Sequence, residues 1–233
     1  MKATRLFTLS LTAATGIWLG GSAASHSVEF RPPADEPAPR HASGGASRGN
    51  ACPQSGATDT PAAMLPFSAF GKTLLPHPTL LFYLPDTSAD GAIFTLKDEN
   101  NTLIYSTEIA LSEETGVVAW TVPEAAPALE LNQSYQWFMV FQCDGRLFPD
   151  SSYISGRIQR TTTEPQADSA VATQLEKAAA LSTAGIWYDG AATLAKLHQE
   201  QPQNSDIAHH WETLLQSVGL EAFATLPVIE IEP

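Results

Sequence analysis

The clearest alternation of apolar and polar side chains in the chain runs through Tyr135–Cys143. Successive side chains of a β-strand point to opposite faces, so this segment is predicted to be the central strand of a two-sheet sandwich. One face is almost wholly apolar and is expected to line the core: Tyr135, Trp137, Met139, Phe141 and Cys143. The other face is polar at both ends, but Phe138 and Val140 lie at its centre. Because a solvated face does not need two apolar side chains, we expect another part of the chain to cover them.

Other short apolar segments follow one another at regular spacing, with turn residues such as Asp98–Asn101 between them. They predict an antiparallel β-sandwich over residues 61–163. The turn that leads into Tyr135 resembles the tyrosine corner of immunoglobulin- and fibronectin-like domains, in which the hydroxyl bonds to upstream backbone. The remaining predicted strands are Met64–Pro66, Pro78–Leu84, Ala92–Lys97, Leu103–Ala110, Val117–Val122 and Tyr153–Arg160.

Residues 164–233 show helical periodicity instead. Asp168 is a candidate cap for the first helix, and Asn204 or Ser205 for the third. The expected helices cover 168–184, Trp187–Glu200 and 205–218. The helical hairpin at the start of this tail resembles a single tetratricopeptide unit, which cannot bury its own apolar face. We therefore predict an α+β protein whose helical tail docks on the sandwich, over Phe138 and Val140.

The first residues have the pattern of a secretory signal peptide. Lys2 and Arg5 form a basic start, Leu6–Gly20 is uncharged and mostly apolar, and small residues follow at 22–24. We predict a signal peptide over residues 1–24, with a retained N-terminal anchor as the alternative. Cleavage would leave an exported protein, periplasmic or extracellular, without a membrane span.

The segment 25–60 is rich in proline and glycine, which favour extended or loose backbone, and is predicted to be a linker. The only cysteines of the chain are Cys52 and Cys143. In an oxidising compartment an even number of cysteines favours a disulfide. The alternative is that both are unpaired small apolar side chains.

The chain is acidic, with a formal net charge of −13. Loss of Lys2 and Arg5 with the signal peptide would remove two more positive charges. Such a charge argues against binding to nucleic acid or to anionic lipid surfaces, and it favours solubility, basic partners or divalent cations.

Few residues suggest chemistry. The spacing of His198, His209 and His210 matches no zinc motif. The acidic pairs lie in expected loops without calcium-loop spacing, and no nucleophile–base motif is present. We therefore predict no catalytic residue, no metal and no cofactor, and a protein that is not an enzyme. The remaining candidates are three aromatic residues at a helix junction, which are either core residues or part of an exposed binding groove: Trp187, Tyr188 and Trp211.

Several short motifs occur together in this sequence. They are Pro32-Pro33 with Arg40, GGASRG at 44–49, Cys52, PTLLFYLP at 78–85, Ile104-Tyr105, SYQW at 134–137, Cys143-Asp144, GRIQR at 156–160, GIWYD at 185–189 and LLQSVGL at 214–220. Together they resemble an uncharacterised family of exported cyanobacterial proteins, domain of unknown function 928. The sequence departs from that pattern at Arg157, where a tryptophan is expected, and in a shorter loop at 144–150. The resemblance implies export and supplies no activity.

A sandwich with a helical hairpin and no site chemistry favours a non-catalytic module of the cell envelope that binds another envelope protein. This hypothesis rests on analogy between folds. Two alternatives stay open: a protein that binds carbohydrate or a small ligand, and an enzyme of unrecognised type.

Overall fold

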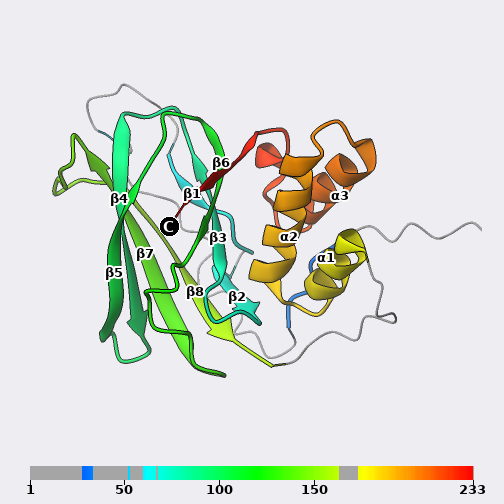
Figure 1. Ribbon diagram of the computed structural model, residues 1–233, viewed down its shortest axis with the longest axis horizontal. Helices are drawn as coiled ribbons and strands as arrows, with labels where there is room; N and C mark the ends of the chain where they lie inside the picture. Colours follow the sequence, from blue (N-terminus) through cyan, green and yellow to red (C-terminus); the bar gives the residue numbers. More distant parts are fainter. Residues whose placement is uncertain (1–27, 34–51, 53–59, 67, 163–172, 233) are drawn as a thin grey trace, which may run out of the picture.

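The computed structural model describes residues 28–33, 52, 60–66, 68–162 and 173–232. Two β-sheets face each other, and three helices stand beside them (Figure 1). The four-stranded sheet has the order β1 (Ala62–Ala63), β3 (Thr79–Leu84), β6 (Gly116–Thr121), β9 (Val228–Ile231). The five-stranded sheet has the order β2 (Phe70–Thr73), β8 (Tyr153–Arg160), β7 (Ser134–Cys143), β4 (Ala89–Asp98), β5 (Leu103–Ala110).

Both sheets are mixed, so the prediction of an entirely antiparallel sandwich is wrong. β2 pairs in parallel with β8, and β9 pairs in parallel with β6. The sequence analysis missed both β2 and β9. Each has only four residues; Gly71 and Lys72 weaken the strand pattern of the first, and the second follows a helical region directly. The other strands lie where they were predicted, within a few residues.

The apolar face of β7 lines the core between the sheets, as predicted. Trp137, Met139 and Phe141 are at most 1% exposed. Aromatic rings from both sheets meet there, with Phe94 and Trp120 at 4.7 Å and Phe82 and Phe141 at 6.3 Å between ring centroids. The tyrosine corner is also confirmed, because the Glu130 backbone N–H donates to the Tyr135 hydroxyl at 3.2 Å. An immunoglobulin-like strand order is not established by these features.

The helices are α1 (Gln174–Thr183), α2 (Trp187–Glu200) and α3 (Ser205–Gln216), followed by a short 3₁₀ turn, η1 (Glu221–Phe223). Thr173 caps α1 through a capping box with Glu176. Asp168, the cap proposed from the sequence, lies outside the described residues. Asn204 caps α3, as one of the two predicted alternatives. None of the described helices is long and apolar enough to cross a bilayer.

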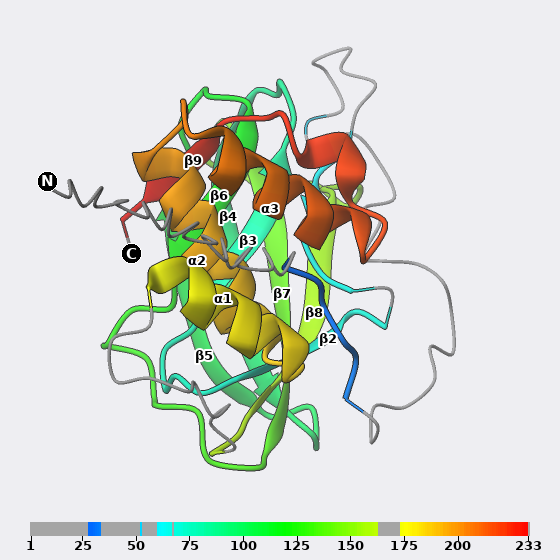
Figure 2. The same cartoon turned by 90° about the vertical axis from the view of Figure 1, so that its right-hand side faces the viewer.

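The helical tail docks on the sandwich at a different place from the one predicted. Helix α2 packs against β2, β3 and β9, so the helices cover the outer side of the four-stranded sheet and the β2 edge of the other (Figures 1 and 2). Phe138 and Val140 lie on the far face of the five-stranded sheet and stay partly exposed. The tail is also not wholly helical, because its end adds β9 to the four-stranded sheet.

The described part of the N-terminal segment is not a linker. Residues 28–33 are extended and pack against the helices, with Val28 and Phe30 buried. Their backbone N–H groups donate to the His210 ring nitrogen Nδ1 at 3.4 Å and to the Ser217 hydroxyl at 3.1 Å. The Phe30 ring meets Trp187 edge to face, with centroids 5.1 Å apart. This segment therefore covers part of the apolar surface of the helices, beside the part that packs on the sheets.

Candidate functional site

The three aromatic residues proposed as binding candidates are buried. Trp187, Tyr188 and Trp211 are 1%, 3% and 0% exposed. The Trp187 indole N–H donates to the Met64 carbonyl at 2.9 Å. None of the three rings is presented to solvent, so they do not form the exposed groove that was one of the two interpretations. They pack as core residues between the helices and the sheets.

Tyr188 makes the central polar contact of this interface. Its hydroxyl accepts a hydrogen bond from the Trp137 indole N–H at 2.8 Å and donates to the Arg157 carbonyl at 3.1 Å. Burial raises the pKa of Tyr188 well above its usual value. Gly71 leaves room for the ring, because a Cβ at that position would lie 2.8 Å from it. The ring therefore joins α2 to both β7 and β8.

Asp189 follows directly and holds the end of β2. Its carboxylate accepts hydrogen bonds from the Thr73 hydroxyl at 2.5 Å and from the Leu74 backbone N–H at 2.8 Å. Burial raises the pKa of Asp189, and these two hydrogen bonds offset part of that effect. Sequence reasoning did not select this residue, although it ends the GIWYD motif. Its partners show a role in fixing α2 against the sheet.

The uncovered outer face of the five-stranded sheet is the larger candidate site. The register of β4, β7 and β8 places nine outward side chains in three rows of three. We call this set the outer-face grid. Its rows are Ile93, Val140 and Tyr153; Thr95, Phe138 and Ser155; and Lys97, Gln136 and Arg157. Strand spacing and rise give the grid a size of about 10 by 14 Å.

Each row of the grid has a different chemistry. The first is apolar, and Tyr153 within it is 48% exposed. The third carries two cations, each close to an aromatic ring: Lys97 Nζ lies 5.6 Å from the centre of the Phe138 ring, and the Arg157 guanidinium lies 5.6 Å from that of Phe70. Such contacts orient the cations over the face while leaving them accessible to water.

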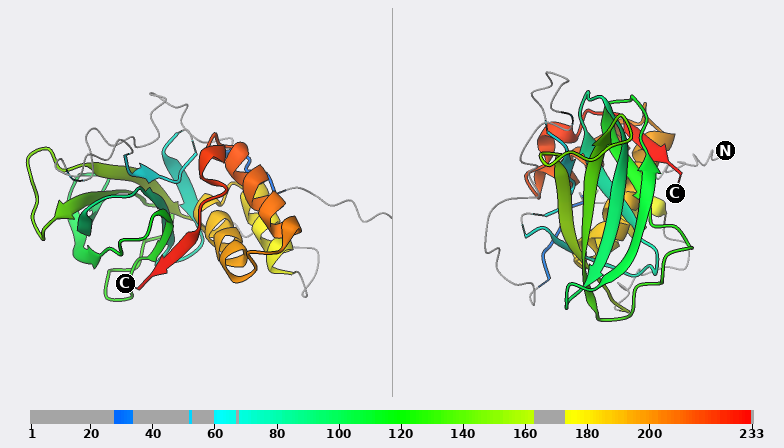
Figure 3. Two further views of the ribbon diagram at one scale, coloured as in Figure 1. Left: turned by 90° about the horizontal axis from the view of Figure 1, so that it is seen from above. Right: turned by 90° about the vertical axis from the view of Figure 1, so that its left-hand side faces the viewer.

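No described helix or strand lies over this face. The right panel of Figure 3 looks directly onto it, with the helices behind the sheets. The two apolar residues at its centre, Phe138 and Val140, were expected to be covered by the tail. The two apolar residues in the outer row of β7 were therefore the feature of the sequence that pointed to this face. The prediction that the helical tail covers them was wrong.

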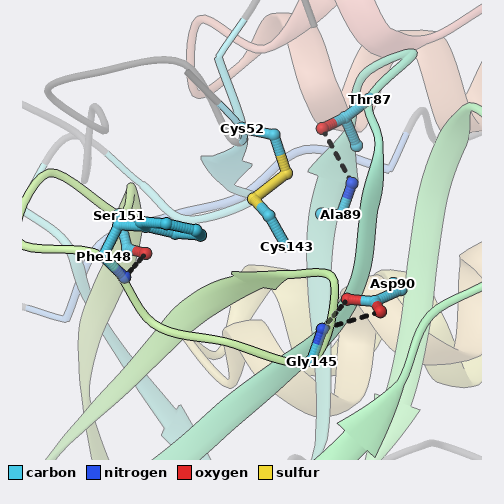
Figure 4. Close-up of a disulfide and its surroundings, with 8 residues drawn as sticks. All are labelled: Cys52, Thr87, Ala89, Asp90, Cys143, Gly145, Phe148 and Ser151. Atoms are coloured by element: carbon cyan, nitrogen blue, oxygen red, sulfur yellow. Dashed lines mark hydrogen bonds between the residues drawn. A yellow bond between two sulfur atoms is a disulfide. The ribbon is translucent and has the colours of Figure 1, made fainter. Parts of the chain in front are cut away.

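The loop between β7 and β8 projects at the end of the grid where the apolar row lies (Figures 1 and 3). The disulfide predicted between Cys52 and Cys143 is present at the base of this loop, with the two Cα atoms 5.8 Å apart (Figure 4). The Asp90 carboxylate also accepts from the Gly145 N–H at 2.9 and 3.2 Å. Two apolar side chains beyond these anchors face solvent: Leu147, 48% exposed, and Phe148, 37% exposed.

Two of the described histidines take structural positions, and the His209 and His210 rings lie 6.1 Å apart. His210 accepts the Val28 N–H, and the His198 ring stacks on Trp211 at 6.1 Å. Within the part of the chain that the structure describes, no three His, Cys, Asp or Glu side chains are grouped closely enough to hold a metal ion.

Comparison with known proteins adds a family but no activity. The chain has no significant match among curated proteins. The family model described as Domain of Unknown Function (DUF928) matches residues 43–228. Because that match spans most of the 233 residues, the chain belongs to this family.

Proposed function

We propose that this protein is an exported, non-catalytic module that binds another protein of the cell envelope. The observation that carries the proposal is the apolar tip of the β7–β8 loop, Leu147 and Phe148, next to the apolar row of the outer-face grid. Loops usually expose small or polar residues, and apolar side chains grouped on a surface are typical of interaction sites.

The anchoring of the loop supports this proposal. The disulfide and the Asp90–Gly145 hydrogen bonds hold its base, and the Phe148 N–H donates to the Ser151 hydroxyl at 2.9 Å within it. A loop that is already ordered loses less conformational entropy when it binds. Exposed aromatic side chains on such a scaffold are the usual anchors of protein interfaces.

Two further features support a module without catalysis. The buried ionisable groups at the helix junction, Tyr188 and Asp189, are both engaged in hydrogen bonds that join α2 to the sheets. The nine residues of the grid are apolar, hydroxyl- or amide-bearing and cationic; the carboxylate that the register places beside them is Glu108 on β5, next to Ile93 in the apolar row. Export is supported by the signal-peptide pattern at residues 1–24 and by the Cys52–Cys143 disulfide, which is typical of oxidising compartments.

A photo-crosslinking pair tests the proposal in the intact cell envelope. A photoreactive residue replaces Leu147 in one variant and Leu131 in the other; both leucines are 48% exposed, and Leu131 lies by the opposite end of β7. We expect a discrete protein adduct from position 147 that is absent from position 131 and decreases when Phe148 is changed to serine. Equal labelling from both positions, or no adduct from 147, would refute a protein partner at this loop.

A further inference from the structure

We infer that the cationic half of the outer-face grid binds an anionic polysaccharide, one whose sugars carry carboxylate or sulfate groups. This inference goes beyond the proposed function, because it concerns the Lys97–Gln136–Arg157 row instead of the loop tip. The two sites lie at opposite ends of the same face, and each can be tested without the other.

The distribution of charge is the first argument. The chain carries a formal charge of −13, yet the grid contains two cations and no carboxylate. Arg160, close to Arg157 in sequence, is used internally: its guanidinium donates to the Leu74 and Leu129 carbonyls. Lys97 and Arg157 instead project from the outer face, so an otherwise acidic protein presents a local site for an anion. Charges more than about 8–10 Å away are largely screened at physiological salt. The acidic group beside this row is Glu99, whose carboxylate accepts the Ser134 N–H two residues before Gln136, so Lys97 and Arg157 leave one net positive charge at this end of the face.

The spacing of the side chains is the second argument. Lys97 and Arg157 flank Gln136 on the adjacent strands, which places their backbones about 10 Å apart. Arginine binds carboxylate and sulfate oxygens through two parallel N–H donors, and lysine supplies a point charge. Between them the Gln136 amide offers both a donor and an acceptor, which suits a hydroxyl group.

The row behind the cations completes the surface. Phe138 is partly exposed, with Lys97 Nζ 5.6 Å from the centre of its ring and with Thr95 and Ser155 on either side. An exposed ring provides an apolar platform for the C–H face of a sugar, and the flanking hydroxyls can donate to or accept from its hydroxyl groups. One row thus offers two cations with an amide between them, and the row behind it offers a ring between two hydroxyls. This arrangement suits an extended chain of charged sugars.

A protein partner fits this half of the grid less well. The cores of protein interfaces are depleted in lysine and in other charged side chains that would lose their water. The Lys97–Gln136–Arg157 row would place two cations and an amide in such a core. A hydrated glycan leaves these groups in contact with water and satisfies them with its own oxygens.

Binding of polygalacturonate to the full-length exported protein, measured by calorimetry, tests the inference. Neutral dextran is the control for the sugar chain, and poly-glutamate is the control for an acidic polypeptide. The double variant Lys97→Gln/Arg157→Gln is compared with Lys177→Gln/Lys196→Gln, which removes the same charge from exposed positions on the helices. The variant Phe138→Leu keeps an apolar side chain but removes the ring, and melting curves confirm that each variant is folded.

We expect polygalacturonate to bind, dextran not to bind, and poly-glutamate to bind more weakly. Exposed ion pairs contribute about 0.2–1 kcal/mol each, so the outer-face double variant should weaken binding by about 2- to 30-fold and the helix double variant by less than about twofold. Phe138→Leu removes the platform and also the ring that Lys97 contacts, so it should weaken binding while changing the salt dependence less than the outer-face double variant does. No binding of polygalacturonate, equal losses in the two double variants, or stronger binding of poly-glutamate would each overturn the inference, and none of these results would bear on a protein partner at Leu147 and Phe148.

Discussion

Removal of the Tyr188 hydroxyl is expected to destabilise the protein, although it deletes only one heavy atom. The variant Tyr188→Phe keeps the ring that packs against Gly71, and therefore creates almost no cavity. It removes the acceptor of the Trp137 indole N–H and the donor to the Arg157 carbonyl. Trp137 is only 1% exposed, so water cannot take over this contact.

The magnitude follows from the two groups left without a partner. A buried donor that loses its acceptor costs about 1–3 kcal/mol. The Arg157 carbonyl belongs to a strand and keeps part of its hydrogen bonding, so its loss is smaller. We expect Tyr188→Phe to lower the free energy of unfolding by about 2–3 kcal/mol.

Urea denaturation of the disulfide-intact protein measures this loss, with Tyr135→Phe as the matched control. The change also removes one hydrogen bond, but that bond is only part-buried and comes from the backbone N–H of Glu130, an exposed residue whose N–H water can satisfy. The control should cost less than about 1 kcal/mol. If Tyr188→Phe lowers the free energy of unfolding by no more than Tyr135→Phe does, the idea that this hydroxyl joins the helices to the sheets is refuted.

Three other predictions concern stability. Burial raises the pKa of Asp189, so its contribution to stability is complete below about pH 4 and is lost as the pH rises through the raised pKa. The free energy of unfolding of Asp189→Asn, relative to that of the unchanged protein, should therefore increase as the pH rises above about 4, and a difference that does not change with pH would contradict this. The disulfide closes a sequence separation of 91 residues, so replacing Cys52 and Cys143 by serine should lower the free energy of unfolding by up to about 4–5 kcal/mol. In the unchanged protein, thiol labelling after unfolding without reduction should find no free thiol. Phe30→Ala should cost about 3 kcal/mol in thermal unfolding, as a core truncation does, whereas exposed Arg31→Ala should cost a few tenths; equal small effects would show that this segment is not packed.

Periodicity in the sequence correctly predicted those strands and helices that are determined by their own residues. The alternation in Tyr135–Cys143 is strong because one face is buried, and the apolar side chains there cannot change register without becoming exposed. The helix Trp187–Glu200 was found with its exact bounds, because Pro202 stops it and its apolar residues recur every three or four positions. The disulfide followed from the count of cysteines and the expected compartment.

Other features depend on partners that are distant in the sequence. The strands Phe70–Thr73 and Val228–Ile231 are too short to show a period, and they are strands because β8 and β6 supply the hydrogen bonds. Residues 28–33 were interpreted as a linker from their prolines. Val28 and Phe30 are buried because they meet His210 on α3 and Ser217 at the end of that helix, far along the chain.

The position of the helical tail shows why apolar area alone did not locate the docking site. Trp187, Tyr188 and Asp189 each carry a polar group that must find a partner when buried. The β2 side of the sandwich supplies those partners, through the Met64 and Arg157 carbonyls, the Trp137 indole and the Thr73 hydroxyl.

The β2 side of the sandwich also has room for the aromatic rings of the helices. Gly71 and Gly156 have no Cβ where one would collide with the Tyr188 ring or the Trp137 ring, so the aromatic side chains can approach the strands closely. The Phe138 and Val140 face offers no comparable set of buried acceptors and donors. Docking there would have buried three polar groups without partners, at about 1–3 kcal/mol each, which exceeds the gain from covering two partly exposed apolar side chains. Hydrogen bonding therefore accounts for where the helices dock, and that position leaves the outer-face grid open to solvent.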